Sequence, residues 1–221
     1  TGNERITGSR RRGGVLMRRT MGVVLFLIVA GGALWGQTRP DALQLYRQGR
    51  YDEAVEVTLE ELEETPRNMN SYTVLGWSLL ALGRYEDALD YGARALEISR
   101  YDNRIVQIVA EAHYRLGNNI EALDYLEEYV AIAPTGDLID QVYFFMGEVF
   151  MRLGEYNNAD VAFSTAVYHK GDDARWWSRL GYARELARDF SSAAEAYEQA
   201  LDLNSSLTEA RRGLDRIEDE L

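Results

Sequence analysis

Alanine returns along this chain at nearly constant intervals, and this recurrence limits the possible folds more than any other feature of the sequence. The alanines are Ala54, Ala88, Ala122, Ala159 and Ala193, which gives spacings of 34, 34, 37 and 34 residues. A fixed period of this length is typical of a chain built from stacked copies of one supersecondary unit.

Other residue types recur together with the alanines. Twelve residues before each alanine lies a small residue: Ala42, Gly76, Ala110, Gly147 and Gly181. Five residues before it lies a glycine in four units and Arg188 in the last: Gly49, Gly83, Gly117 and Gly154. Small residues in two helices let their backbones approach closely, and glycine ends a helix without a Cβ penalty. The pattern therefore predicts two antiparallel helices in every unit.

The strongest units carry a recognisable motif. The second contains Leu75-Gly76 followed by Gly83-Arg-Tyr-Glu-Asp-Ala88, and the fourth contains Met146-Gly147 followed by Gly154-Glu-Tyr-Asn-Asn-Ala159. This period and pattern resemble the tetratricopeptide repeat family, whose units stack into a right-handed superhelix. The resemblance implies an all-α, right-handed solenoid of about five helical hairpins, and the apolar residues before them predict an N-terminal hydrophobic targeting helix. The hairpins are predicted at residues 35–68, 69–102, 103–136, 140–173 and 174–207.

The ends and the spacing of the repeats lead to three further expectations. Residues 208–221 should form a capping helix with Leu214 and Ile217 on one side. Three extra residues after Pro134 should lengthen the loop or the following helix and change the superhelix angle locally. The first unit is the weakest match, and its short first helix should begin near Pro40, with the proline in the first turn.

The N-terminal region has the pattern of a targeting segment. Five arginines between residues 10 and 19 precede residues 20–38, which carry no charge. This order is typical of a signal peptide or a signal anchor. We expect residues 1–36 to be cleaved after Gly36, or to remain as an anchor in the membrane through residues 20–38. In both cases residues 37–221, the repeat domain, would reach the periplasm or cell envelope. Residues 1–16 are expected to be upstream translation, because Met17 would make a compact start.

Composition argues against several classes of chemistry. The chain contains no cysteine, and its two histidines have no metal-binding spacing. The glycines are accounted for by the repeat, so none is left for a phosphate-binding loop. The net charge of −12 repels a phosphate backbone, which argues against nucleic acid as a partner. We therefore expect no catalytic residues, no metal and no cofactor.

The resemblance implies that the first helices of successive units line a concave groove. The ten main candidates for contact with a partner are Trp77, Leu80, Arg104, Gln107, Tyr114, Arg115, Phe144, Met151, Arg152 and Tyr182. Further groove positions implied by the family are Asn70, Thr73, Glu111, Gln141, Glu148, Arg175, Ser178 and Glu185. Aromatic and methionine side chains suit an apolar or helical segment, and arginines select carboxylates at its flanks. An open alternative is that Trp77, Phe144 and Tyr182 pack between repeats or against the N-terminal segment.

These features predict a non-enzymatic scaffold or adaptor of the cell envelope that holds a protein or peptide segment in its groove. The alternative is a subunit that binds or delivers a small apolar molecule beside a transporter. We expect the chain to contact the membrane only through the N-terminal segment, and stacked terminal repeats would allow self-association.

Overall fold

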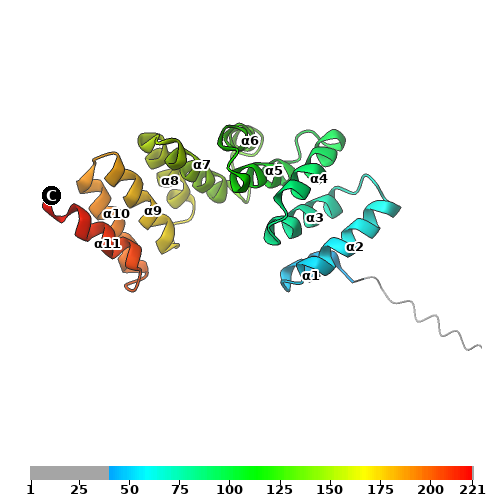
Figure 1. The fold of residues 1–221 in the computed structure, drawn as a ribbon, viewed down its shortest axis with the longest axis horizontal. Helices are drawn as coiled ribbons and strands as arrows, with labels where there is room; N and C mark the ends of the chain where they lie inside the picture. Colours follow the sequence, from blue (N-terminus) through cyan, green and yellow to red (C-terminus); the bar gives the residue numbers. More distant parts are fainter. Residues whose placement is uncertain (1–39, 221) are drawn as a thin grey trace, which may run out of the picture. The chain divides into compact units, whose positions relative to one another are not determined.

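The computed structural model describes residues 40–220, and within this range the chain forms helices and turns without a strand (Figure 1). The predicted targeting segment, with its cleavage site and its role as an anchor, lies outside the described residues. The helices are α1 (Ala42–Arg47), α2 (Tyr51–Glu64), α3 (Met69–Ala81), α4 (Tyr85–Ile98), α5 (Asn103–Leu116), α6 (Asn119–Ile132), α7 (Ile139–Leu153), α8 (Tyr156–His169), α9 (Ala174–Leu186), α10 (Phe190–Leu203), α11 (Thr208–Ile217) and the short 3₁₀ helix η1 (Glu218–Glu220).

Consecutive helices pair into five hairpins, and each hairpin packs against the next one along the sequence (Figure 1). The first helices of neighbouring hairpins also contact one another, as α1 contacts α3, α3 contacts α5, and α5 contacts α7. Helix α11 packs on both α9 and α10. The predicted all-α solenoid of about five hairpins with a C-terminal capping helix is confirmed. We call the side formed by α1, α3, α5, α7, α9 and α11 the first-helix face.

The recurring small residues lie where the helices meet. All five alanines of the repeat have no exposed surface. A Cβ added at Gly147 would come within 2.6 Å of the Phe163 ring, and one at Gly181 within 2.7 Å of the Tyr197 ring. These positions therefore accept only a hydrogen as side chain, because the aromatic ring of the second helix occupies the remaining space. The small residues therefore recur because paired helices approach each other closely, as the sequence predicts.

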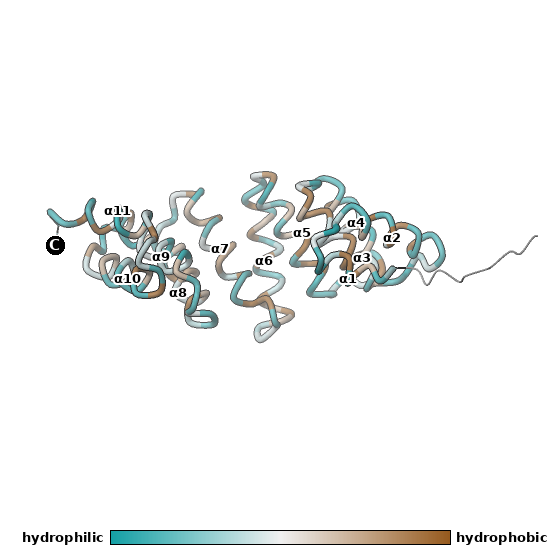
Figure 2. The backbone as a smooth tube through the Cα atoms, turned by 90° about the horizontal axis from the view of Figure 1, so that it is seen from below, coloured by the Kyte–Doolittle hydropathy of each residue, from teal (hydrophilic) through white to brown (hydrophobic). Residues whose placement is uncertain are grey.

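The α-helices carry both hydrophobic and hydrophilic residues along their length, as Figure 2 shows. Most of the apolar residues are buried between the hairpins, and most of the charged ones face solvent, although Ile120, Val161 and Tyr168 are exposed. In residues 40–220 no helix combines the length and the apolar character that crossing a bilayer requires.

The turns between paired helices use the left-handed backbone region that glycine favours. Gly117 has a φ of 82° and Gly154 a φ of 75°, and Gly49 and Gly83 are similar. Arg188, which replaces glycine in the last hairpin, adopts the same conformation with a φ of 66°. A residue with a Cβ is disfavoured there by about 1 kcal/mol. The last turn therefore keeps the geometry of the others at a conformational cost.

The three extra residues of the fourth unit are divided between a loop and a helix. The loop before α7 covers residues 133–138, whereas the loop before α5 covers only residues 99–102. Helix α7 has 15 residues and α5 has 14. Two of the extra residues therefore lengthen the loop and one lengthens the helix. The expected change in superhelix angle stays a prediction.

The first helix begins later than the sequence suggested. Helix α1 is short, as expected, with only six residues. It starts at Ala42 because the Asp41 side chain caps it by accepting hydrogen bonds from the backbone N–H groups of Leu43 and Gln44. The placement of Pro40 in the first turn was therefore wrong, because the proline precedes the cap.

The C-terminal cap has the predicted arrangement. Ile217 is buried, and Leu214 packs against the same cluster at the end of the core. Gly213 faces the Tyr197 ring so closely that an added Cβ would lie 2.3 Å from it. Tyr197 thus fills the space between α9 and α11 and packs the capping helix against the last hairpin.

Candidate functional site

Two cavities open on the first-helix face. The larger, about 680 Å³, lies where α9 meets α11, and we call it the arginine pocket. Its lining residues are Arg175, Ser178, Arg179, Tyr182, Glu185, Leu186, Tyr197, Leu207, Glu209, Arg212 and Arg216. Four of these eleven side chains are cationic, in a chain whose net charge is −12. This cavity is therefore a local exception to the acidic character of the protein.

Two of the arginines are held in fixed positions. Arg179 donates from Nε and Nη2 to the two carboxylate oxygens of Glu148, at 2.5 and 2.9 Å. Arg216 donates from its own Nε and Nη2 to the two carboxylate oxygens of Glu185, each at 2.7 Å. Both guanidinium groups lie 5.6 Å from the centre of the Tyr182 ring. Because a guanidinium has five N–H donors, each arginine keeps donors that these carboxylates do not use.

The carboxylate of Glu185 connects α9 to both neighbouring helices. It accepts hydrogen bonds from Arg216 and from the Tyr197 hydroxyl at 2.6 Å. Burial raises the pKa of Glu185, but the hydrogen bonds from Arg216 and Tyr197 outweigh this effect and leave the pKa below its usual value. Burial, together with the hydrogen bond to Glu185, raises the pKa of Tyr197. At neutral pH the pocket therefore has an ionised glutamate and a neutral tyrosine.

Other cations of the arginine pocket are open to solvent. Arg212 is exposed and has no hydrogen bond or ion pair within the described part of the chain. Arg175 pairs with Asp173, although its side chain is 78% exposed. Leu186 and Leu207 supply apolar surface beside these charges. The cavity thus suits a group that combines a carboxylate with an apolar body.

The second cavity, about 540 Å³, lies between α3 and α5, and we call it the Gln107 pocket. Its lining residues are Tyr46, Trp77, Leu80, Ala81, Tyr85, Gln107, Glu111, Arg115, Leu138 and Gln141. The rings of Tyr46 and Trp77 are 5.8 Å apart. Helix α1, the turn before α7 and α7 itself therefore contribute walls to a cavity that is centred on the second and third hairpins.

The polar groups of this pocket form a short chain. Gln107 is only 3% exposed, and its Nε2 donates to Glu111 Oε2 at 3.0 Å. Arg115 donates to the other carboxylate oxygen of Glu111, from Nη2 at 3.0 Å and from Nε at 3.3 Å. Gln107 Oε1 is buried and has no hydrogen-bond partner. This oxygen is therefore closed off from the cavity as well as from the donors of the described residues.

Five of the ten main candidates line these two cavities. Trp77, Leu80, Gln107 and Arg115 belong to the Gln107 pocket, and Tyr182 belongs to the arginine pocket. The structure thus collects these predicted residues in two places along the first-helix face. Whether they contact a partner stays a prediction.

Four other candidates pack between hairpins. Phe144 stacks on Trp176 with ring centres 4.8 Å apart, and Met151 packs against the same core cluster. Arg152 places its guanidinium 3.9 Å from the Tyr114 ring centre and donates to the Tyr114 carbonyl at 2.6 Å. These contacts connect α7 to its neighbours. They favour the packing alternative for Phe144, and they place Tyr114, Met151 and Arg152 in contacts between hairpins as well.

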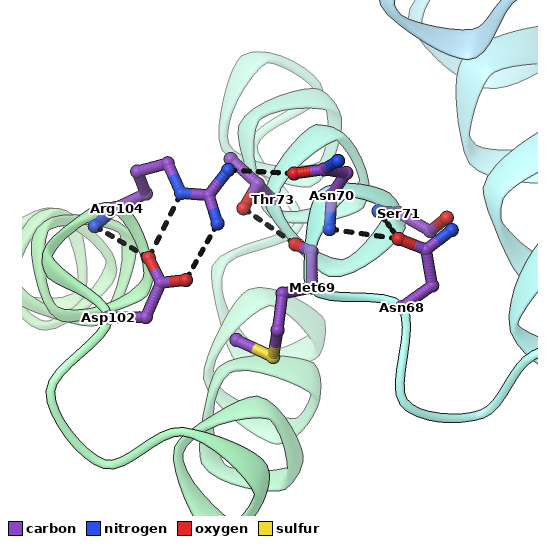
Figure 3. A network of polar contacts seen from close by, with 7 residues as sticks. All are labelled: Asn68, Met69, Asn70, Ser71, Thr73, Asp102 and Arg104. Carbon is purple, nitrogen blue, oxygen red and sulfur yellow. Dashed lines mark hydrogen bonds and ion pairs between the residues drawn. The ribbon is translucent and has the colours of Figure 1, made fainter.

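Arg104, the remaining candidate, joins two repeats through a polar network (Figure 3). It donates from Nη2 to Asp102 at 2.7 Å and from Nη1 to Asn70 at 2.9 Å. Burial raises the pKa of Asp102, but its hydrogen bonds with Arg104 outweigh that effect and lower the pKa. The network ties the start of α5 to α3. Thr73 and Ser178, also expected in the groove, are both buried, although Ser178 still lines the arginine pocket. Thr73 donates to the Met69 carbonyl in the same network.

Several residues of the arginine pocket were not predicted, because α11 was interpreted only as a cap. Arg212 and Arg216 come from α11, and Arg179 comes from an α9 position that was not selected. The signal for α11 is the step of 34 residues from Ala174 to Thr208, the first residues of α9 and α11. Helix α11 therefore occupies the position that the first helix of a sixth unit would have.

Neither pocket contains a histidine or cysteine, and residues 40–220 hold no cluster of side chains suited to a metal ion. The arrangement offers cations, acceptors and aromatic faces. These groups can bind and orient a segment of another molecule.

Comparison with known proteins places the chain in a family. The family model described as tetratricopeptide repeat matches residues 42–103 and 146–208, more than half of the chain. The chain therefore belongs to the tetratricopeptide repeat family. Proteins of this family are generally non-enzymatic scaffolds that bind proteins or peptides.

Two curated relatives share part of their length with this chain. Human protein O-mannosyl-transferase TMTC1 is 25% identical over 183 residues, which are 80% of this chain and 20% of the relative. The TPR repeat-containing protein MJ1428 of Methanocaldococcus jannaschii is 29% identical over 161 residues, which are 72% of this chain and 28% of the relative. The chain thus spans less than a third of either relative.

Solved structures share the fold. MamA, from residue 41 to its end, of Desulfovibrio magneticus RS-1 has a TM-score of 0.66 and 20% identity, covering 76% of this chain and 93% of that chain. YrrB, described as a TPR protein with an unusual peptide-binding site, has a TM-score of 0.64 and 17% identity, covering 79% and 88%. TTC0263, a thermophilic TPR protein of Thermus thermophilus, has a TM-score of 0.61 and 22% identity, covering 80% and 95%. At these identities the similarity shows the fold alone.

Proposed function

We propose that this protein is a non-enzymatic scaffold that holds a protein or peptide segment along its first-helix face. The observation that carries the proposal is the arginine pocket, in which Arg179 and Arg216 are fixed near the Tyr182 ring by carboxylates of the protein itself. Groups that are already fixed lose little conformational entropy when a ligand binds. The pocket is therefore prepared to receive a carboxylate on the bound segment.

The chemistry of both pockets favours a peptide over a small apolar molecule. Each pocket has glutamate and arginine side chains in its wall. Burying these charges against an apolar ligand would cost free energy, whereas a peptide supplies both charged groups and hydrogen bonds. The description of YrrB as a TPR protein with a peptide-binding site supports the same interpretation by analogy of fold.

The test uses the full chain as bait in extracts of the source organism, followed by affinity measurement with the captured partner. Arg212→Glu reverses an exposed charge that the fold does not use. Reversal should weaken binding about tenfold, because an attractive contact becomes a repulsive one. Arg67→Glu is the matched control, since Arg67 is exposed, lies in the loop before α3 and lines neither pocket. Equal affinities for Arg212→Glu and the unmodified chain would contradict the assigned site.

We also propose that the repeats work outside the cytoplasm, in the periplasm or cell envelope. The support is the run of arginines that precedes the uncharged residues 20–38. Fusing residues 17–40 to a reporter should export the reporter. Its retention in the cytoplasm would overturn this part of the proposal.

A further inference from the structure

Arg188 holds a backbone conformation that its side chain disfavours. Its φ of 66° is the one positive value at a residue other than glycine in residues 40–220. The four equivalent turns use glycine, which adopts this conformation without a Cβ penalty. Strained residues of this kind gather at functional sites, so an observed outlier is a ground for a functional hypothesis. The arginine side chain should therefore contribute something that glycine cannot.

The guanidinium of Arg188 is free to bind another molecule. Arg188 is exposed, and its side chain makes no hydrogen bond or ion pair within residues 40–220. Its guanidinium lies 5.6 Å from the centre of the Phe190 ring, a contact that uses none of the N–H donors. The neighbouring Asp189 caps α10 by accepting from the backbone N–H of Ser192. All five N–H donors of Arg188 are therefore available to a ligand.

Arg188 lines a third cavity, of about 560 Å³, which lies between the turn before α8 and the turn before α10. We call it the turn pocket. Its lining residues are Gly154, Glu155, Tyr156, Asn157, Asn158, Leu186, Ala187 and Arg188.

The turn pocket adjoins the arginine pocket. Leu186 lines both cavities and is the last residue of α9. It lies four residues beyond Tyr182, which is about 6 Å along the helix axis. An extended chain covers that distance with about two residues. A short segment bound in the arginine pocket can therefore reach Arg188.

The lining of the turn pocket favours an acidic group over a basic one. Arg188 is its one cation, and no carboxylate within the described residues pairs with it. Glu155 is its one acidic side chain, and it already accepts a hydrogen bond from Asn158 Nδ2 at 2.7 Å. A basic group would be repelled by the unpaired guanidinium, whereas a carboxylate would find donors that have no other acceptor.

We propose that the bound segment carries a second acidic residue, which pairs with Arg188 in the turn pocket while the first one occupies the arginine pocket. This inference rests on the proposed function. It makes the partner segment acidic at two points and gives it a path from α11, across the end of α9, to the turn before α10. It also gives the strained turn a role, because glycine at this position would relieve the backbone but lose the cation.

The experiment selects binders to the full chain from a random peptide library and measures their affinities in about 0.15 M salt, which screens distant exposed charges. Arg188→Glu reverses the charge and keeps a residue with a Cβ at the turn. It should weaken binding about tenfold, because an attractive contact becomes a repulsive one, and leave the melting temperature unchanged. Arg211→Glu is the matched control, since Arg211 is exposed on α11 and lines neither pocket. It should bind as the unmodified chain does.

Arg188→Gly separates a binding role from a structural one. It should raise the melting temperature by about 1 to 4 °C, because the penalty of the positive φ is removed. It should also weaken binding about two- to fivefold, the usual contribution of an exposed ion pair. A residue that only maintains the fold would not combine higher stability with weaker binding. Unchanged or tighter binding by Arg188→Gly would overturn the inference.

Changes in the peptide locate the contact. Each acidic residue of a selected peptide is replaced by its amide, one at a time. One replacement should weaken binding to the unmodified chain but not to Arg188→Glu, and a different one should do the same with Arg212→Glu.

The outcomes distinguish the inference from the proposed function. Selected peptides that respond to Arg212→Glu but not to Arg188→Glu would overturn the inference and leave the proposed function standing. Peptides that respond to neither change, or failure to select any peptide, would overturn both.

Discussion

The arginine pocket and the Gln107 pocket both lie where first helices of neighbouring units meet, but their polar groups are arranged differently. In the arginine pocket, Arg216 and Tyr197 both donate to Glu185, so the protein satisfies its own buried groups. In the Gln107 pocket, the oxygen of Gln107 remains unpaired. The one other unpaired buried side-chain oxygen in the described part of the chain, Asp140 Oδ1, belongs to a residue that lines neither cavity.

This difference teaches that cavities in equivalent places of one scaffold can differ in their chemistry. At the C-terminal end, internal ion pairs hold arginines in place and leave their remaining donors for a ligand. At the second and third hairpins, the one arginine of the lining is paired with Glu111, and the amide oxygen of Gln107 is buried without a partner. The last hairpin also differs in its turn, where Arg188 adopts a conformation that glycine adopts in the other hairpins. Stability and binding should therefore respond differently to changes at the two ends.

The largest expected effect comes from filling the space that holds the capping helix. Gly213→Val would drive a side chain into the Tyr197 ring, since even a Cβ would lie 2.3 Å away. Overpacking of this kind should lower the free energy of unfolding by about 2 to 3 kcal/mol. It should also remove amide-exchange protection from α11. The arginine pocket should be lost as well, because α11 forms one of its walls. The Gln107 pocket should be unaffected.

Asp215→Val is the control for that change, because it adds the same side chain to an exposed position of α11. It should change the free energy of unfolding by no more than about 0.5 kcal/mol. Equal urea-unfolding curves for the two variants would show that the packing of α11 on Tyr197 contributes nothing to the free energy of unfolding.

The next effect tests the internal ion pair of the arginine pocket by pH. The pKa of Glu185 is lower in the folded chain than its usual 4.5, so in acid the unfolded chain binds the proton more readily. The stabilising contribution is present above that usual value and is lost as the pH falls through the lower, folded pKa. Glu185→Gln should therefore lower the free energy of unfolding by about 1 kcal/mol at pH 7, after allowing for the half-exposed Arg216.

Urea unfolding of both chains between pH 7 and pH 3 measures this contribution. The difference between Glu185→Gln and the unmodified chain should shrink below pH 4.5, where the unmodified chain also loses the charge. A difference that stays constant over the whole range would mean that the carboxylate charge is not responsible.

The smallest effect concerns the turns. Arg188→Gly should raise the free energy of unfolding by about 0.5 to 1 kcal/mol, because glycine adopts a positive φ without a Cβ penalty. Gly154→Ala should lower it by about 1 kcal/mol at the equivalent turn. Thermal or urea unfolding gives both values. Changes of the same sign would contradict the account of the turns.

The sequence predicted the fold well because its main signal is steric. A buried alanine such as Ala88 or Ala159 recurs wherever two helices must approach closely, so the period gives the hairpins directly. The division of three residues between a loop and α7 was less accessible, since a loop and a helix can absorb an insertion equally well. The start of α1 depended on which residue caps it, and Asp41 does so.

The site could be predicted only in part. Trp77 and Phe144 were both expected on the groove side, yet Trp77 lines a cavity whereas Phe144 stacks on Trp176 of the next hairpin. The choice between these outcomes depends on how neighbouring hairpins sit against each other, which a single unit does not encode. The unpaired oxygen of Gln107 was not predictable either, because it results from the position of Glu111 one turn later.

The central claim is that the first-helix face is the binding surface. Amide hydrogen exchange of the full chain, with and without its captured partner, tests this directly. The account predicts added protection in α3, α5, α9 and α11, the helices that contribute most to the two pockets. Protection confined to the second helices α4, α6, α8 and α10 would contradict it.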